Sequence, residues 1–423
     1  MVENSRISGF HKLTREERIA KVKELTGISD EEIEPLISPG SVDLAILDRM
    51  IENVIGSMTL PLGIATNFRI NGKDYLIPMA IEEPSVVAAA SNAARMARPH
   101  GGFFATDTGP VMRAQVQAVN VPSPHAAKMK IIESKEEILK LANEQDPILV
   151  NLGGGARDLH VKVIDSAVGP MVITELVVDT RDAMGANAVN TMAEAVAPMI
   201  ERITGGRVFL RILSNLADLR LVRVRATFDR ELLGGEEVVD GIIAAWAFAE
   251  ADPYRCATHN KGIMNGIDAV VIATGNDFRA IEAGAHSYAA RDGHYSSLTK
   301  YEKDPEGNLV GTIEIPMAVG LVGGATKTHP VARACIKILG VKTATELGHV
   351  IASVGLAQNL AALRALADEG IQRGHMALHA KNVAVTAGAE GDLIDIVAER
   401  MVRERRINVA RAKEILAELL SKN

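Results

Sequence analysis

A lysine set among glycines and asparagines is the first feature of this sequence that could do chemistry. Lys261 lies in Thr258-His-Asn-Lys-Gly-Ile-Met-Asn265, before an apolar run that predicts a strand over 269–273. An ammonium in such a stretch can stabilise a negative oxygen that develops during a reaction. Asp277 follows the apolar run, and a buried ammonium needs a charged partner, so we expect a Lys261–Asp277 pair. The alternative is a lysine on the solvated surface, where most lysines lie.

Two acidic side chains adjoin at Glu82-Glu83-Pro84, where a strand predicted over 74–81 ends. Adjacent residues of a strand point to opposite sides, so at most one of the two glutamates can face a given site. Carboxylates at the start of the following helix are also favoured by the helix dipole. The residues alone therefore leave open both a catalytic acid and a helix-terminal acid.

Two histidines four residues apart, His375 and His379, precede the C-terminal helices. A zinc site would need a third protein ligand, and the neighbouring sequence offers none. A single histidine beside Gly374, on a segment that can move, is better suited to act as a general acid. We therefore predict no metal site.

A glycine-containing junction, Asp182-Ala-Met-Gly-Ala-Asn187, joins a strand predicted over 171–178 to a helix predicted over 187–203. Free N–H groups at such a helix start bind anions, and a dinucleotide pyrophosphate would fit. A glycine that only allows tight packing is the alternative. Gly153-Gly-Gly-Ala-Arg-Asp158 departs from the Rossmann pattern, and Gly323-Gly-Ala-Thr-Lys-Thr328 from the P-loop. A nicotinamide cofactor would therefore bind by another scheme.

The elements that position these residues follow a mixed pattern. Two capping boxes, Thr14 with Glu17 and Ser29 with Glu32, predict N-terminal helices, and a third helix is predicted over 42–55. In the middle of the chain the expected order is β, α, β, β, α, β, which is that of a split βαβ module.

We predict an α+β fold: a large helix-rich α/β domain, an inserted small ferredoxin-like (split βαβ) domain and a helical C-terminal segment. A chain of 423 residues exceeds what one core supports, so several domains are expected. The predicted bounds are 1–109 and 219–376 for the large domain, 110–218 for the small one and 377–423 for the C-terminal segment.

Composition excludes several classes of protein. A net charge of −7 argues against nucleic-acid binding, which needs a basic face. Cys256 and Cys335 are far apart, so no disulfide framework is expected and a cytoplasmic setting is favoured. The first residues carry no apolar signal segment, and the uncharged stretch 347–363 contains enough polar residues to predict a buried helix. No membrane association is expected.

Seven motifs in this order resemble the 3-hydroxy-3-methylglutaryl-coenzyme A (HMG-CoA) reductases. Their Glu-Glu-Pro and Asp-Ala-Met-Gly-Ala-Asn variants are similar to the soluble class II branch. The resemblance implies a cofactor domain inserted in a substrate domain, a mobile C-terminal flap, and homodimers or larger assemblies with the active site at the dimer interface. The motifs are Glu52–Gly56, Glu82–Pro84, Asp182–Asn187, Thr258–Asn265, Gly275–Asp277, Gly323–His329 and Gln372–His375.

The same resemblance assigns roles to individual residues. The reaction it implies reduces HMG-CoA with two hydrides, through a hemithioacetal and mevaldehyde, to mevalonate and coenzyme A. Catalytic roles are implied for Glu83, Lys261, Asp277 and His375. Substrate contacts are implied for Arg255, Asn265, Ser85 and Asn359, and cofactor contacts for Asp182, Met184, Gly185, Asn187 and Asn215.

Asp146 bears on the choice of cofactor. Resemblance to class II reductases that prefer NADH places an acid here, between a helix predicted to end near Glu144 and a strand predicted over 148–152. A carboxylate accepts a hydrogen bond from a ribose 2′-hydroxyl and repels a 2′-phosphate. We therefore predict that NAD(H) is preferred and NADP(H) tolerated. The alternative is a solvated aspartate in a turn before Pro147.

Two other classes of function use the same residues. One is an acyl-CoA lyase or hydrolase that employs the Lys261, Asp277 and Glu83 cluster without hydride transfer. The other is a binding or structural protein that keeps the fold. Oxidation of a reduced nicotinamide in the presence of HMG-CoA, together with release of free thiol, separates all three.

Overall fold

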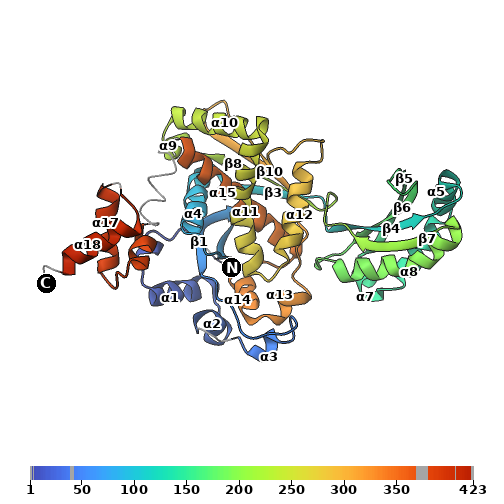
Figure 1. Cartoon of the computed structure of the whole chain (residues 1–423), viewed down its shortest axis with the longest axis horizontal. Helices are drawn as coiled ribbons and strands as arrows, with labels where there is room; N and C mark the ends of the chain where they lie inside the picture. The colour runs from blue at the N-terminus through green and yellow to red at the C-terminus, as the bar shows by residue number, and fades with distance from the viewer. Residues whose placement is uncertain (1, 3, 39–41, 368–379, 405, 421–423) are drawn as a thin grey trace.

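The computed structural model describes residues 2, 4–38, 42–367, 380–404 and 406–420 (Figure 1). Both predicted capping boxes are confirmed, at the starts of α1 (Arg15–Thr26) and α2 (Asp30–Ile37). The helix predicted over 42–55 is wrong, because only α3 (Leu44–Leu47) forms there. Several apolar side chains of this stretch, Leu44, Met50, Ile51 and Ile55, are exposed and do not pack into a core of the described residues.

A six-stranded sheet organises the larger part of the molecule, with the strand order β2-β1-β3-β8-β10-β9. Neighbouring strands are antiparallel except β1 and β3, which are parallel. The sequence also predicts a hairpin of residues 295–304 and 309–315, and the antiparallel pairing of β9 with β10 confirms it, whereas β1 and β3 were not predicted. The strands are β1 (Leu62–Ile70), β2 (Lys73–Ala80), β3 (Phe103–Asp107), β8 (Leu221–Phe228), β9 (Thr299–Lys303) and β10 (Leu309–Pro316).

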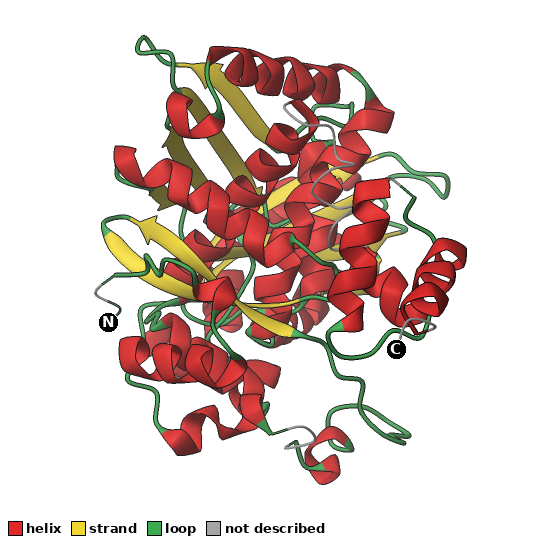
Figure 2. Ribbon diagram, turned by 90° about the vertical axis from the view of Figure 1, so that its left-hand side faces the viewer, coloured by secondary structure: helices red, strands yellow, loops and turns green. Residues whose placement is uncertain are grey.

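Helices cover much of this sheet in Figure 2. The buried helix predicted over 347–363 is confirmed as part of α15 (Ala344–Ala367), which packs against α4, α10, α11 and β8. α15 is long and apolar enough to cross a membrane, but most of it is buried inside the fold, as in the core helix of a globular domain. The others are α4 (Val86–Ala97), α9 (Arg230–Leu233), α10 (Glu236–Ala251), α11 (Pro253–Ala273), α12 (Phe278–Ala289), α13 (Gly324–Thr328) and α14 (Pro330–Leu339).

The strand predicted over 269–273 is wrong. α11 begins at Pro253, capped by the Asp252 side chain, and continues without a break to Ala273. A short run of apolar residues fits a buried strand and a buried helix equally well, and here the tertiary packing against α15 and β2 decides for the helix.

A four-stranded antiparallel sheet lies at the right of Figure 1, with the order β5-β6-β4-β7. This is the strand order of a split βαβ module. α5 (Pro124–Glu133), α6 (Lys135–Asn143) and α8 (Ala186–Thr204) pack against it and against one another. The strands are β4 (Val111–Val119), β5 (Gly155–Ile164), β6 (Met171–Asp179) and β7 (Arg207–Leu213).

Residues 148–152 do not form the predicted strand. They lie in and just after the short helix α7 (Pro147–Asn151), and Asp146 caps this helix: its Oδ1 accepts a hydrogen bond from Leu149 N at 2.9 Å. Proline at the first helical position and aspartate at the cap together favour a helix start. The sequence predicted the strand because the apolar run Ile148–Val150 was taken without this capping signal.

The C-terminal part is built around its own small core. α17 (Leu393–Glu404) and α18 (Val409–Leu420) pack together through apolar side chains that include Val397, Met401 and Ile415. They lie at the left of Figure 1, on the opposite side from the four-stranded sheet.

Candidate active site

Glu83, Lys261 and Asn265 form one polar cluster. Glu83 lies in the connection from β2 to α4, and its Oε2 accepts hydrogen bonds from Lys261 Nζ and from Asn265 Nδ2, each at 3.1 Å. Lys261 and Asn265 are four residues apart on α11, so their side chains lie next to each other on one helix face. The structure thus brings together two predicted catalytic residues and one predicted substrate contact.

Asp277 is not part of this cluster within the chain. It caps α12, its Oδ1 accepting from Arg279 N at 3.0 Å and Ala280 N at 3.3 Å, and it pairs with the Arg279 guanidinium. The expected Lys261–Asp277 pair is therefore absent from the described residues. The physical reason is the length of α11, since the twelve residues from Lys261 to Ala273 advance about 18 Å along the helix axis.

Ser85 has an unusual backbone beside Glu83. Its φ is 76°, in the left-handed region, although it is not glycine. Its Oγ is buried and has no hydrogen-bond partner among the described residues. A strained residue with an unused buried hydroxyl is typical of a functional site.

The start of α8 has the features of an anion-binding helix terminus. Gly185 caps it with a φ of 103°, and no side chain caps its first turn. A Cβ at Gly185 would lie 2.4 Å from Thr180 Cγ2, so only glycine fits. Met184 precedes this start, and Asn187 is exposed in the first turn. The predicted strand-to-helix junction is confirmed.

Residues 14–380 match the profile of the family described as hydroxymethylglutaryl-coenzyme A reductase. The chain belongs to that family. It is 65% identical over 418 residues to the 3-hydroxy-3-methylglutaryl-coenzyme A reductase of Archaeoglobus fulgidus, covering 99% of this chain and 95% of the relative. The predicted family and the predicted reductase activity are confirmed.

Solved structures of the Streptococcus pneumoniae enzyme share the fold. One, described as 3-hydroxy-3-methylglutaryl-coenzyme A reductase, superposes with a TM-score of 0.84 at 41% identity and covers 97% of this chain and 99% of its own. A second, described as the class II enzyme bound to NADPH in open conformations, gives 0.82 at 42% identity, with coverages of 96% and 100%. The class II resemblance and the α+β fold of this reductase are confirmed.

In this reductase Asp182 accepts hydrogen bonds from two backbone N–H groups that lie far along the chain. Its Oδ1 accepts from Ala344 N at 2.8 Å, at the start of α15, and its carbonyl accepts from Leu321 N at 2.9 Å. Asp182 therefore anchors the loop before α8 through its carbonyl and one carboxylate oxygen.

Arg220 is a residue that the sequence interpretation missed. It is buried, and it donates to Thr180 Oγ1 at 3.0 Å, to the carbonyls of Ala183 and Met184 at 3.1 and 3.2 Å, and to Val319 O at 2.6 Å. Burial lowers the pKa of Arg220 to about 10, so it stays protonated at neutral pH. Its acceptors, the Thr180 hydroxyl and three backbone carbonyls, are distant in sequence, so no local motif indicates them.

Asn359, a predicted substrate contact, lies elsewhere. It is 1% exposed, and its Oδ1 accepts from Thr299 Oγ1 at 2.9 Å and from Tyr301 OH at 3.0 Å, while its Nδ2 lies 3.3 Å from Nε2 of His259. Burial lowers the pKa of His259 to about 3, so this ring is neutral. The structure places Asn359 in a closed core network rather than in the cluster with Lys261.

Arg255 and Asn215 occupy less defined positions. Arg255 lies in the first turn of α11, where its backbone N donates to Asp252 at 2.8 Å. Asn215 is exposed in the connection from β7 to β8, beside Gly284 of α12.

His375, the fourth predicted catalytic residue, lies outside the described residues. No group of three or more metal-ligating side chains occurs in the described part of the chain.

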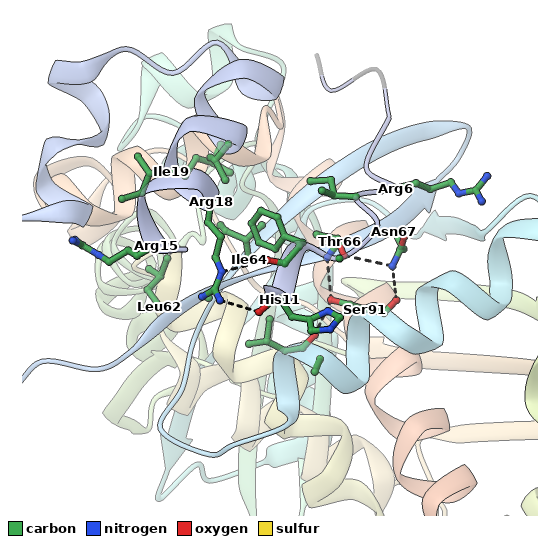
Figure 3. A pocket seen from close by; sticks show the side chains of 18 of the residues that line it. Arg6, His11, Arg15, Arg18, Ile19, Leu62, Ile64, Thr66, Asn67 and Ser91 are labelled. Carbon is green, nitrogen blue, oxygen red and sulfur yellow. Dashed lines mark hydrogen bonds between the residues drawn. The ribbon is translucent and has the colours of Figure 1, made fainter. Parts of the chain in front are cut away.

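A large basic cavity lies along α4. It has a volume of about 1330 Å³ and lies between the N-terminal segment, β1 and the α4 face that carries Val87, Ser91 and Arg95 (Figure 3). This face begins within one turn of Ser85. Apolar walls alternate with the guanidinium side chains of Arg6, Arg15, Arg18 and Arg95. These arginines carried no motif, so the sequence interpretation missed the cavity.

Proposed function

We propose that Lys261 stabilises the oxygen that becomes negative as each hydride reaches the carbonyl carbon, and that Glu83 supplies its proton. The hydride itself comes from the nicotinamide when that cofactor is bound. The observation that carries the proposal is the contact of Glu83 Oε2 with both Lys261 Nζ and Asn265 Nδ2. An ammonium and an acid that meet at one point can hold an oxyanion and protonate it in the same position.

His375 is proposed, on the resemblance alone, to protonate the coenzyme A thiolate that leaves the hemithioacetal. Ser85 and Arg255 are proposed to bind the acyl group. Overall, one HMG-CoA, two reduced nicotinamides and two protons give mevalonate, coenzyme A and two oxidised nicotinamides. The direct test is oxidation of NADH or NADPH with HMG-CoA, followed by absorbance, together with thiol release in a ratio of one thiol to two cofactors.

Different parts of the chain are proposed to bind the substrate, bind the cofactor and cover the site. Residues 1–109 and 219–376 would bind the acyl-CoA, residues 110–218 the nicotinamide cofactor, and residues 377–423 would form a flap over the site. The open N-terminus of α8 supports the second assignment, because its N–H groups suit a pyrophosphate. Asp182, Met184, Gly185, Asn187 and Asn215 are the proposed cofactor contacts.

The coenzyme A moiety is proposed to lie in the basic cavity along α4. Its phosphates would meet the arginines, and its pantetheine arm would follow the apolar wall toward Ser85 and Glu83. Arginine binds phosphate through charge-assisted hydrogen bonds, which makes it suited to this task.

Arg95→Ala is expected to raise the KM for HMG-CoA by about tenfold, the equivalent of one lost charge-assisted hydrogen bond. The kcat/KM for mevaldehyde, which has no coenzyme A moiety, should stay unchanged. Steady-state kinetics with both substrates measure this. Arg207→Ala, an exposed arginine on β7, is the matched control. Equal losses with both substrates would place coenzyme A elsewhere.

The nicotinamide use of this reductase is proposed to favour NAD(H) and to tolerate NADP(H). The relative solved with NADPH supports the use of a nicotinamide cofactor and the tolerance of NADP(H). Asp146 Oδ1 accepts the hydrogen bond that caps α7. Its Oδ2 could therefore accept a hydrogen bond from a ribose hydroxyl, and its charge would repel a 2′-phosphate.

Asp146→Asn is expected to narrow the NADH-to-NADPH ratio of kcat/KM by about tenfold, corresponding to ~1.4 kcal/mol. Asparagine keeps the helix cap and removes the charge, whereas Asp146→Ala removes both. Both variants should shift the ratio equally if charge is the selector. A ratio that moves only in the alanine variant would trace the effect to the cap, and a wild type that prefers NADPH would contradict the assignment.

A homodimer, or a larger assembly of dimers, with the active site at its interface is proposed as the working form. Lys261 is 62% exposed in the single chain, although a strong oxyanion donor needs a water-excluded site. The irregular segment 44–58 also exposes large apolar side chains, which a partner could cover. These are Leu44, Met50, Ile51, Ile55 and Met58.

A further inference from the structure

A group of titratable side chains lies between α11 and α12 and has no part in the proposed reaction. Glu282 Oε2 lies 2.6 Å from His286 Nε2, and His286 Nδ1 lies 2.8 Å from Tyr295 OH. On the other side, Glu282 shares a hydrogen bond with Asp268 of α11. α11 and α12 pack directly against each other (Figure 1). We call Asp268, Glu282, His286 and Tyr295 the Asp268 network.

Asp268 and Glu282 can share a hydrogen bond only if one of them holds a proton, because ionised carboxylates are acceptors only. Burial, reinforced by the hydrogen bond with Glu282, raises the pKa of Asp268 to about 8. The hydrogen bond with His286 instead lowers the pKa of Glu282. The proton therefore resides on Asp268 at neutral pH, and Glu282 is ionised beside His286.

The surroundings of Asp268 agree with a neutral acid. Its Oδ1 is buried without a hydrogen-bond partner among the described residues, which would be costly for a charged oxygen. Among the titratable groups of the described residues, Glu282 is the one that shifts the pKa of Asp268. The pKa of Glu282 is in turn shifted by His286 and Asp268.

The network connects the helices that carry two proposed catalytic residues. Asp268 lies one turn beyond Asn265 and two turns beyond Lys261 on α11. Glu282 lies on α12, whose first turn is capped by Asp277. A direct link from Asp268 to Glu282 therefore fixes the helix of Asp277 against the helix of Lys261.

We propose that Asp268 is a positioning residue, whose proton, shared with Glu282, holds α12 against α11 and so fixes the place of the Asp277 carboxylate at the start of α12. The proposal rests on the proposed function for the role of Lys261 and on the family resemblance for that of Asp277. Loss of the proton leaves two carboxylates side by side, and their repulsion pushes the two helices apart.

The first test is the pH profile of kcat for the full-length enzyme. The wild type should lose activity above pH 8, and Asp268→Asn should move this alkaline limb up by at least one pH unit, because a carboxamide donates the same hydrogen bond at every pH. The ratio of variant to wild-type kcat at pH 9 should be about ten times the ratio at pH 7. The KM for the nicotinamide should not follow this change.

Two further variants sharpen this test. Glu282→Gln should move the limb in the same direction, because it also removes the like charge. Asp292→Asn makes the same chemical change in an exposed loop just beyond α12 and should leave the limb in place. An alkaline limb that is identical in wild type and Asp268→Asn would overturn the positioning role.

The second test is thermal unfolding, which does not depend on the proposed function. The folded-state pKa of Asp268 lies above its unfolded value of about 4, so its contribution to stability is complete below pH 4 and is lost as the pH rises to about 8. The difference in Tm between Asp268→Asn and the wild type should therefore rise in favour of the variant from pH 5 to pH 8. Above pH 8 this difference should stay constant. A constant offset over the whole range would overturn the shared proton.

Discussion

Replacing Lys261 with alanine is expected to lower both hydride steps by about 10²–10³-fold, since a negative oxygen forms on the substrate in each. The measurement is NAD(P)H oxidation with HMG-CoA and, separately, with mevaldehyde. In the structure Lys261 Nζ lies 3.1 Å from Glu83 Oε2 and is the only ammonium recorded in that contact within the described residues. Its loss leaves Asn265 as the remaining donor to Glu83.

The fold should survive this substitution, because the Lys261 side chain is largely exposed in the chain and contributes little to the core. Cofactor affinity should also be unchanged, since the proposed cofactor contacts belong to other elements. Lys300→Ala, an exposed lysine on β9, is the matched control. A Lys261→Ala enzyme that keeps more than a few per cent of mevaldehyde reduction would contradict a common oxyanion role.

Local signals in the sequence were sufficient where the deciding interactions are themselves local. The capping boxes of α1 and α2 are formed by residues three apart, and both were predicted. The junction before α8 was predicted because its glycine and its helix pattern are adjacent. The hairpin of β9 and β10 follows from a short turn between two alternating segments.

The errors arise where partners distant in sequence decide. The apolar runs at 148–152 and 269–273 predicted strands, and both proved helical because capping and packing, not hydrophobic periodicity, set their conformation. β3 pairs with β8 more than a hundred residues later, so neither its existence nor its place could be read locally. Arg220 was missed for the same reason, because its acceptors, the Thr180 hydroxyl and three backbone carbonyls, are distant in sequence.

The candidate site shows the same division. Motifs supplied Glu83, Lys261 and Asp277 as residues, but the pair predicted from them, Lys261 with Asp277, differs from the pair found in the chain, Lys261 with Glu83. The pairing depends on whether α11 ends after Lys261 or continues, and its continuation separates Lys261 from Asp277 within one chain. A second copy of the chain is the simplest source of the missing aspartate, and this idea leads to a sharp test.

Co-expression of Lys261→Ala chains with Asp277→Ala chains in equal amounts is expected to restore activity, although neither variant is active alone. If Lys261 of one chain works with Asp277 of another, a site is intact when its lysine comes from the Asp277→Ala chain and its aspartate from the Lys261→Ala chain. Each condition holds for half of the sites, so about a quarter of wild-type activity should return in a symmetric assembly of dimers.

The same fraction holds for any larger assembly built from such dimers, because only the pairing across one interface matters. The matched control is co-expression of Lys261→Ala chains with chains that carry both substitutions. In that mixture every chain lacks Lys261, so no activity should return.

Activity is measured as HMG-CoA-dependent NADH oxidation on the purified mixture, with each variant alone as the baseline. If the first mixture stays at that baseline, Lys261 and Asp277 must act from the same chain.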